Sequence, residues 1–432
     1  MATFGRHCQN LTIPITISSH QPLFSPPLFT TNLDATSFAQ SFLQRGRILA
    51  AELTIGNQTL QSTYNISAAF CHPLSGISDA PLQILTHGVG FDKVYWDLPY
   101  NAYNYSWVSN AVEKYGFNTL AIDRLGIGAS SHGNPVNEIQ AYAEVEALRQ
   151  VTLAARAGTV PGIAKPGGFK KVVHVGHSFG SILSYWLSAL DPNVTDGLVL
   201  TGFSRDTGSA AGIFFAGWDI KLASLNQPFR FGSHTRGRGV DGDFLPLLKN
   251  YVKSLGSNPS FTSQELWNDI ATTEMRNLIV GLNDTSVTPQ DLPGGYLTWA
   301  DFTANQFLFL LPGHYDVGLG LYTETIKQPI TVGELLTIGA PPDSSNFAGP
   351  VLVLTGDKDL AACGGDCYAT GGAGGAGGNI PAQSVKAFPK ARPFKAYIQP
   401  RTAHGLNAHY NASAAYDIAH TWLGTHGLGG KA

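Results

Sequence analysis

The chain has 432 residues, only 13% of which are charged, and its formal net charge is −3 at pH 7. This length can bury a large core, or a core together with a substantial insertion. The weak charge leaves no basic face for nucleic acid or an anionic membrane, and no apolar run reaches the roughly 18 residues of a membrane span.

The first 80 residues are predicted to be rich in β-structure. Residues 10–18 (NLTIPITIS) alternate between apolar and polar positions, and residues 62–73 (STYNISAAFCHP) form a second candidate strand. Cys8 precedes the first segment and Cys71 lies near the end of the second. Adjacent strands would bring the two thiols together, so we predict a Cys8–Cys71 disulfide. The alternative is a pair of unrelated thiols.

A regular alternation of apolar strands and helices begins at residue 81. The helices are expected over 107–116 and 137–157 and directly after Gly180, and the strands over 81–88, 118–126, 172–175 and 195–204. Apolar strands separated by helices predict a parallel sheet that is covered on both faces. The fold class is therefore α/β, with a mostly parallel, doubly wound sheet.

The alternation stops after residue 204 and resumes with a strand at 349–360. The residues between them are far too many for a loop. We therefore predict a large, mostly helical cap or lid domain at 205–349, inserted after the sixth strand into a core of 1–204 and 350–432. Most of its aromatic residues should form the cap's own core, and only a few should face a substrate. These residues are Phe214, Phe215, Trp218, Phe229, Phe231, Trp267, Tyr296, Trp299, Phe302, Phe307, Phe309, Tyr315 and Tyr322.

A strand, a sharp turn and a helix follow one another over residues 172–190, with Ser178 at the apex of Gly176-His177-Ser178-Phe179-Gly180. Only small residues fit two positions before and after such a serine. The geometry lifts the hydroxyl out of the sheet and leaves the Phe179 N–H free at a helix N-terminus, where it can bind an oxyanion. Ser178 is therefore the predicted nucleophile, and the alternative is a tight structural turn.

A serine hydroxyl needs a base, and the base needs an orienting group. His404 follows the predicted last strand, 394–400, and Asp359 follows the strand that resumes the sheet. Groups at the carboxyl ends of parallel strands converge, and the order Ser178, Asp359, His404 is that of an α/β-hydrolase triad.

Other residues compete for the acid and base roles. Asp357 and Asp366 lie in the same loop as Asp359, and Asp206 follows an earlier strand. Among the histidines, His177 is expected to pack inside the turn, while His409 and His420 are expected in the closing helix, 409–423.

The second oxyanion donor is sought in His87-Gly88-Val89-Gly90, which follows the strand 81–88. Glycines allow this turn to point its N–H groups into the site, so the Val89 N–H is the predicted partner of the Phe179 N–H. The alternative is an ordinary glycine-rich turn. Asp123 and Arg124, after the next strand, are predicted to hold neighbouring loops.

Cys363 and Cys367 lie directly after Asp359. A metal site would require more ligands than two thiols, and none lie at suitable spacing. We therefore predict a small disulfide loop that stiffens the segment carrying the acid. Neither a metal nor an organic cofactor is expected.

Together these motifs resemble the α/β-hydrolase superfamily, over roughly residues 50–204 and 349–425. They are HG-x-G, DR-x-G-x-G, G-H-S-x-G, GDKD and a late HG. The phrases HGVGFDKVYWD, TWADFTANQF and KQPITVGELLTIG are similar to a group of fungal secreted α/β-hydrolases. This resemblance implies ester-type hydrolysis without naming a substrate. A serine at position 178 also sets the chain apart from epoxide hydrolases and haloalkane dehalogenases, whose equivalent turn carries Asp.

The expected function is that of a serine esterase. Through an acyl-enzyme, it would cleave a carboxylic ester or lactone of an apolar, medium-sized molecule. A peptidase, amidase or C–C hydrolase with the same triad remains an alternative, as does a non-catalytic ligand-binding protein. The expected partner is a small-molecule substrate, with no nucleic acid and no stable membrane insertion, and the sequence does not predict an oligomeric state.

Four cysteines and seven N-x-S/T sequons favour a secreted, disulfide-bonded glycoprotein. The first ten residues lack the apolar segment of a signal peptide. An intracellular protein with free thiols is the alternative. The sequons begin at Asn10, Asn57, Asn65, Asn104, Asn193, Asn283 and Asn411.

Overall fold

An eight-stranded sheet forms the centre of the protein in a computed structural model that describes residues 5–205, 207, 210–232, 277, 280, 289–369 and 379–430. Neighbouring strands from β4 to β11 run parallel, whereas β1 pairs antiparallel with β2, and β2 with β4. In spatial order the strands are β1 (Arg6–Phe24), β2 (Thr54–Pro73), β4 (Asn118–Ile122), β3 (Leu82–Thr86), β5 (Val172–His177), β6 (Gly197–Thr201), β10 (Val351–Gly356) and β11 (Phe394–Gln399). The predicted fold class is confirmed.

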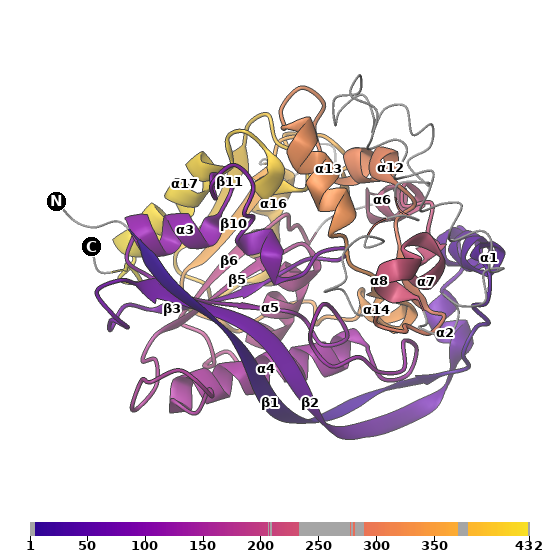
Figure 1. Ribbon diagram of the computed structural model, residues 1–432, viewed down its shortest axis with the longest axis horizontal. Helices are drawn as coiled ribbons and strands as arrows, with labels where there is room; N and C mark the ends of the chain where they lie inside the picture. Colours follow the sequence, from indigo (N-terminus) through magenta and orange to yellow (C-terminus); the bar gives the residue numbers. More distant parts are fainter. Residues whose placement is uncertain are drawn as a thin grey trace, which may run out of the picture.

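The central strands are buried because helices cover both faces of the sheet. Every residue of β3, β4, β5, β6 and β10 is buried, as expected for apolar strands in a parallel sheet. The helices α4 (Ala141–Ala157) and α5 (Phe179–Leu190) lie on one face, and α3 (Trp107–Ser109) and α17 (Ala412–Thr425) on the other (Figure 1).

Local side-chain hydrogen bonds shift some helix boundaries from their predicted positions. The helix predicted from residue 137 begins at Ala141, because the Asn134 carboxamide accepts the N–H groups of Val136 and Asn137 and so stabilises a turn before it. The helix predicted over 107–116 divides into α3 and a π-helical turn, Asn110–Lys114.

The N-terminal strands form a ribbon that is longer than predicted. Strands β1 and β2 have 19 and 20 residues and pair continuously, but only Ala68–Cys71 of β2 pairs with β4. The free part of the ribbon carries α1 (Asn32–Leu43) and α2 (Leu49–Leu53) to the side of three later helices (Figure 1), which are α7 (Ala223–Asn226), α8 (Pro228–Phe231) and α14 (Val332–Thr337). Neither of these two helices was predicted.

Both predicted disulfides are present. Cys8 and Cys71 are directly opposed in the β1–β2 register, with a Cα–Cα distance of 4.2 Å, so the bridge closes the ribbon where it joins the sheet. Cys363 and Cys367 close a short loop directly after β10, and their Cα atoms lie 4.9 Å apart.

The segment between β6 and β10 contains a small sheet as well as the predicted helices. The antiparallel strands β7, β8 and β9 join parts of the segment that are distant in sequence, and their lengths of two or three residues explain why no strand was predicted. Of the predicted cap aromatics, Trp267 lies outside the described residues. The described elements are α6 (Ala210–Ala216), β7 (Lys221–Leu222), α7 (Ala223–Asn226), α8 (Pro228–Phe231), β8 (Tyr296–Thr298), α12 (Phe302–Phe309), α13 (Val317–Thr325), β9 (Ile330–Thr331) and α14 (Val332–Thr337).

A buried cluster of charges fastens this segment to the core. Arg124 donates to Glu144 of α4 at 2.6 Å and also binds Glu334 of α14, and all three side chains are at most 1% exposed. Asp123 binds the Lys93 ammonium at 2.7 Å and accepts the Ala129 N–H. The structural role predicted for Asp123 and Arg124 is confirmed.

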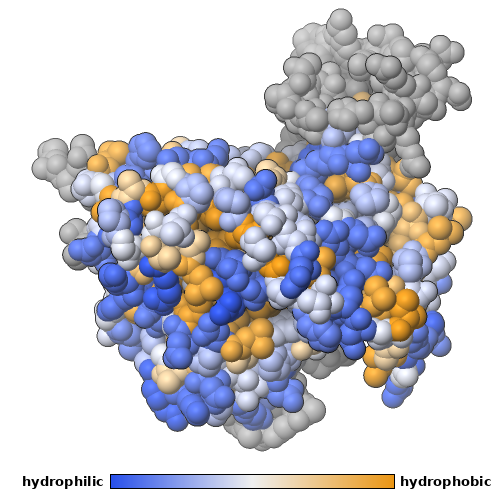
Figure 2. Space-filling model, turned by 90° about the horizontal axis from the view of Figure 1, so that it is seen from below, coloured by the Kyte–Doolittle hydropathy of each residue, from blue (hydrophilic) through white to orange (hydrophobic). Residues whose placement is uncertain are grey.

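Hydrophilic residues are interspersed with small, separate apolar areas on the face shown in Figure 2. Within the described part of the chain, no helix combines the length and the apolar character needed to cross a membrane.

Replacing Cys8 and Cys71 by serine together should lower the free energy of unfolding by about 2–5 kcal/mol, because the bridge restricts a long loop in the unfolded chain. Urea unfolding followed by circular dichroism measures the loss. The Cys363→Ser, Cys367→Ser double variant is the matched control and should lose less stability, because it releases a much shorter loop. An unchanged urea midpoint in the first variant would contradict the expectation.

Candidate active site

Ser178 lies at the junction of β5 and α5 with φ 53° and ψ −117°, a conformation that few residues with side chains adopt. Its N–H donates to the Thr201 carbonyl oxygen at 2.9 Å. A Cβ added to Gly176 would lie 2.5 Å from the carbonyl carbon of Gly180, and one added to Gly180 would lie 2.0 Å from the Thr86 carbonyl oxygen. The turn therefore requires glycine at both positions, as the motif predicts.

His404 connects Ser178 to Asp359 through two hydrogen bonds. Its Nε2 lies 2.8 Å from Ser178 Oγ, and its Nδ1 lies 2.8 Å from Asp359 Oδ2. Asp359 also caps α15 (Leu360–Cys363), because its Oδ1 accepts the Ala362 N–H at 2.8 Å. Asp359 and His404 are buried, whereas Ser178 is partly exposed. The structure thus brings together the three residues that sequence analysis selected.

The competing acids lie elsewhere. Asp357 accepts the Thr402 N–H at 2.9 Å and so shapes the loop before His404 without contacting the imidazole. Asp366 is exposed, and Asp206 lies outside the described residues.

The competing histidines do not bind Ser178. His177 packs inside the turn, as predicted, with its ring 4.4 Å from that of Tyr95. His420 lies in α17, but the prediction that His409 belongs to the same helix is wrong, because α17 begins at Ala412.

His409 instead connects the His404 loop to the segment between β6 and β10. Its Nε2 accepts the N–H groups of Ala403 and Leu311, at 3.1 and 3.0 Å, and its Nδ1 lies 3.0 Å from the Gly405 carbonyl oxygen. The Gly405 N–H donates to the Phe309 carbonyl oxygen at 2.8 Å. These bonds require a neutral imidazole with its proton on Nδ1. The only sequence feature that could have suggested this role is that His409 lies five residues after His404.

The N–H groups of Val89 and Phe179 suit an oxyanion site. Neither N–H has a hydrogen-bond partner among the described residues, and Phe179 begins α5, where helix N–H groups are left free. A Cβ added to Gly88 would lie 2.9 Å from Ser178 Cβ, so the turn that carries Val89 passes directly beside the serine.

His87, which sequence analysis did not select, fixes the orientation of this turn. Its Nε2 accepts the Arg124 N–H at 3.0 Å, so its proton lies on Nδ1, which lies 2.8 Å from the Gly88 carbonyl oxygen. A trans peptide directs its C=O and N–H to opposite sides. Holding the Gly88 carbonyl therefore also orients the Val89 N–H.

Ser178 and His404 open into a cavity of about 220 Å³, and none of the described residues that line it carries a charged side chain. Three of the predicted cap aromatics reach it, namely Phe214, Phe215 and Trp218. Core residues contribute Val89, Ile182, Gly202, Phe203 and Ser204, and α15 contributes Ala361 and Ala362. The rest of the lining is formed by Phe42, Thr207, Ala211, Gly212, Ile330, Leu335 and Ile338.

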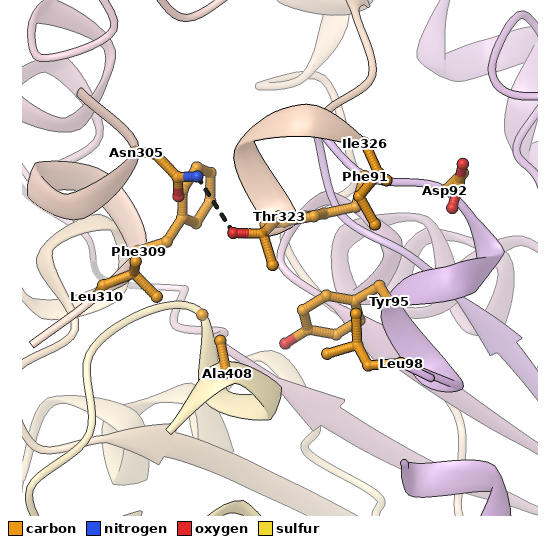
Figure 3. Close-up of a pocket in the computed structure, with 11 residues that line it drawn as sticks. Phe91, Asp92, Tyr95, Leu98, Asn305, Phe309, Leu310, Thr323, Ile326 and Ala408 are labelled. Atoms are coloured by element: carbon orange, nitrogen blue, oxygen red, sulfur yellow. Dashed lines mark hydrogen bonds between the residues drawn. The ribbon is translucent and has the colours of Figure 1, made fainter. Parts of the chain in front are cut away.

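A second, much smaller cavity lies behind Phe309, between the loop that carries Tyr95 and the helices α12 and α13 (Figure 3). Its volume of about 10 Å³ has room for roughly one water molecule. Asn305 donates to Thr323 at 3.2 Å at its edge. Neither Ser178 nor His404 lines it, so it is not part of the candidate active site.

Comparison with known protein families identifies the family of the chain. A sequence model of the alpha/beta hydrolase family matches residues 83–359. The chain belongs to this family. No curated protein matches the chain.

Solved structures resemble this alpha/beta hydrolase at low sequence identity. A mutant epoxide hydrolase from Vigna radiata is 12% identical over 84% of this chain and 96% of its own, with a TM-score of 0.40. A hydrolase from Pseudomonas aeruginosa is 14% identical over 84% of this chain and 95% of its own, with a TM-score of 0.41. Est1E from Butyrivibrio proteoclasticus, solved with ferulic acid bound, is 12% identical over 84% and 96%, also with a TM-score of 0.41.

Several buried histidines resist protonation. Burial is the largest cause, and it lowers the pKa of His174 and His420 to about 3 and that of His409 to about 4. Burial also holds the pKa values of His87 and His177 well below the usual 6.5. All five side chains are therefore neutral in the folded protein near neutral pH.

Acidification should destabilise the fold between pH 6.5 and about 4. In that range the unfolded chain takes up protons that the buried histidines do not, so their full contribution to stability is present above pH 6.5 and is lost as the pH falls. For His409 the loss is about 3 kcal/mol, at 1.36 kcal/mol per pKa unit. Urea midpoints measured from pH 7.5 to 4.5 test this expectation.

The matched control is His409→Gln, whose amide oxygen can accept the same N–H groups without titrating. Its stability should fall less steeply over the same pH range. A variant that follows the wild-type pH dependence would show that His409 does not contribute to it.

Proposed function

We propose that the protein is a serine hydrolase that cleaves a carboxylic ester or lactone of an apolar, medium-sized molecule. The observation that carries the proposal is the hydrogen-bond chain from Asp359 through His404 to Ser178, with Ser178 facing the cavity. Membership of the alpha/beta hydrolase family supports hydrolysis as the class of reaction.

The proposed reaction begins when Ser178 Oγ attacks the ester carbonyl carbon and His404 Nε2 takes the hydroxyl proton. Asp359 accepts from Nδ1–H, so it orients the ring and stabilises the imidazolium that forms. The imidazolium then protonates the leaving alkoxide, and the acyl group remains on Ser178. In the second half, His404 takes a proton from water, the resulting hydroxide attacks the acyl carbon, and Ser178 leaves with the proton.

The negative charge that develops on the carbonyl oxygen would be stabilised by the N–H groups of Val89 and Phe179. Donors held in place before the reaction do not need to reorganise in the transition state, and removing one such donor typically costs a factor of about 10²–10³ in kcat. His87 keeps the turn that carries Val89 in the required orientation.

The cavity supports an apolar substrate. A charged group would lose its hydration there and find no charged partner among the described residues that line the cavity. A peptidase, amidase or C–C hydrolase could use the same triad, and a ligand-binding protein could use the same cavity. Measurement of turnover distinguishes the last of these from an enzyme.

Ser178→Ala should lower kcat for p-nitrophenyl butyrate by several orders of magnitude and abolish labelling by a fluorophosphonate. His404→Ala should have nearly the same effect on kcat, because the two residues act as one unit. The urea midpoint of Ser178→Ala should change little, because this substitution removes only a partly exposed hydroxyl. Near wild-type turnover by Ser178→Ala on every ester that the wild type cleaves would refute the mechanism.

The matched pair Asp359→Asn and Asp357→Asn tests the acid role. Asn at position 359 cannot stabilise the imidazolium as a carboxylate does, so activity should fall strongly, although less than in Ser178→Ala. Asp357→Asn should retain most activity, because Asp357 bonds only to the loop backbone. A larger loss in Asp357→Asn would transfer the acid role to that residue.

We also propose that the chain is exported and glycosylated. The two disulfides support an oxidising compartment. The sequon asparagines at 10, 57, 65, 104 and 193 are exposed, whereas Asn411 donates to the Pro400 carbonyl oxygen at 2.6 Å and accepts from Thr402. Asn283 lies outside the described residues.

Protein secreted from a eukaryotic host should therefore carry glycans at some of the five exposed asparagines and none at Asn411. Glycopeptide mass spectrometry measures the occupancy. Modification at Asn411 alone would contradict the structural argument, and a secreted product without any glycan would contradict the proposal.

A further inference from the structure

One wall of the candidate active-site cavity comes from outside the region that matches the alpha/beta hydrolase family. The match begins at residue 83, and Phe42 is the only lining residue within the described chain that precedes it. Phe42 belongs to α1, which the β1–β2 ribbon carries away from the sheet and places beside the segment between β6 and β10 (Figure 1).

Specific contacts hold α1 against the cavity. Its first turn is closed by a capping box between Thr31 and Asp34. Asn32 Oδ1 accepts the Leu222 N–H at 3.0 Å, which ties the start of the helix to β7. A helix fixed at its N-terminus to the same segment that lines the cavity has a defined position relative to Ser178.

A row of aromatic rings fixes the rest of α1. The ring centroids of Phe29 and Phe38 are 5.4 Å apart, those of Phe38 and Phe42 5.8 Å, and those of Phe42 and Phe215 5.0 Å. Such ring pairs stabilise packing beyond the burial of their surface. The row ends at Phe215 of α6, which lines the cavity together with Phe42.

The size and chemistry of the cavity define a substrate class. A cavity of about 150 Å³ accommodates benzene, so about 220 Å³ accommodates one aromatic ring or a compact branched chain with a few further carbon atoms. Aromatic side chains, Phe42, Phe214 and Trp218, form part of its wall. An apolar group that extends toward these residues would have to displace one of them.

We infer that α1 is part of the substrate-binding site and that Phe42 determines specificity by limiting the length of the apolar group that reaches Ser178. The preferred substrates are then esters whose buried group is an aromatic ring or a compact alkyl chain. This inference rests on the proposed serine hydrolase function, and it adds a determinant that lies outside the catalytic triad.

The test compares kcat/KM for p-nitrophenyl phenylacetate, butyrate and dodecanoate. Wild-type protein should prefer the first two. Phe42→Ala should raise kcat/KM for dodecanoate relative to butyrate by roughly tenfold or more, because small changes of a hydrophobic pocket alter discrimination by factors of about 10–200. Phe42→Trp should lower the value for phenylacetate relative to butyrate.

The matched control is Phe38→Ala. Phe38 lies one turn earlier on α1 and belongs to the same aromatic row, but it does not line the cavity. The Phe38→Ala substitution should reduce stability without changing the ratio of kcat/KM for dodecanoate to kcat/KM for butyrate. If Phe42→Ala does not fold, Phe42→Leu can replace it. Leucine fills less of the cavity than phenylalanine but loses less packing than alanine, so this variant should shift the dodecanoate-to-butyrate ratio of kcat/KM in the same direction.

The possible outcomes separate this inference from the proposed function. Turnover by the wild type together with the same ester ratio in Phe42→Ala, or an equal loss on both esters, would overturn the specificity role while leaving the hydrolase function intact. Absence of turnover and of fluorophosphonate labelling in the wild type would refute the hydrolase function itself, and this inference with it.

Discussion

The backbone of Ser178 sets the geometry on which the rest of the candidate active site depends. A residue with a side chain at φ 53° and ψ −117° costs of the order of 1–3 kcal/mol and persists only where its surroundings impose it. Here the fully buried strand β5 enters the turn, and α5 leaves it at once. Glycines at 176 and 180 allow the strand, the turn and the neighbouring strand β3 to approach closely.

The same close packing extends to the base. A Cβ on Gly202, just after β6, would lie 3.0 Å from His404 Cε1, so the absence of a side chain there makes room for the imidazole. Phe309 stacks on the His404 ring with centroids 5.8 Å apart. His404 is therefore positioned by Asp359, by a glycine of the sheet and by an aromatic ring of the inserted segment, and correct placement of that segment is a condition for an ordered site.

Arg124 and His409 are two of the buried polar residues that connect the inserted segment to the core. Arg124 binds carboxylates of α4 and α14, and breaking such a buried arrangement by removing one partner typically costs about 3–5 kcal/mol. His409 joins the backbone on both sides of His404 to Leu311. At His409 the same contacts also hold the backbone on both sides of His404, the proposed base.

Features with local causes were predictable from the sequence. The buried strands follow from runs of apolar residues, and the turn at Ser178 follows from two glycines at fixed spacing. The position of Asp359 beyond β10 and of His404 beyond β11 follows from the convergence of parallel strand ends. The short strands β7 to β9 have no such local signal, since each gains its hydrogen bonds from distant parts of the chain.

The helix α1 and the roles of His87 and His409 were missed for the same reason. Helix α1 reaches the cavity only because the β1–β2 ribbon extends beyond its pairing with β4, a property of long-range geometry. His87 and His409 act by accepting backbone N–H groups from Arg124, Ala403 and Leu311. Residue type and spacing reveal a histidine, but not which backbone groups will face it after folding.

Each disulfide lies in a segment of the chain that contributes to the cavity wall. Cys8–Cys71 closes the base of the ribbon that carries Phe42, and Cys363–Cys367 lies at the end of α15, the short helix that carries Ala361 and Ala362. The triad residues, by contrast, stand at the ends of buried parallel strands. A change in the ribbon can therefore alter which substrate fits while the geometry of Ser178, His404 and Asp359 stays the same, whereas a change in the short loop also reaches Asp359, which caps α15.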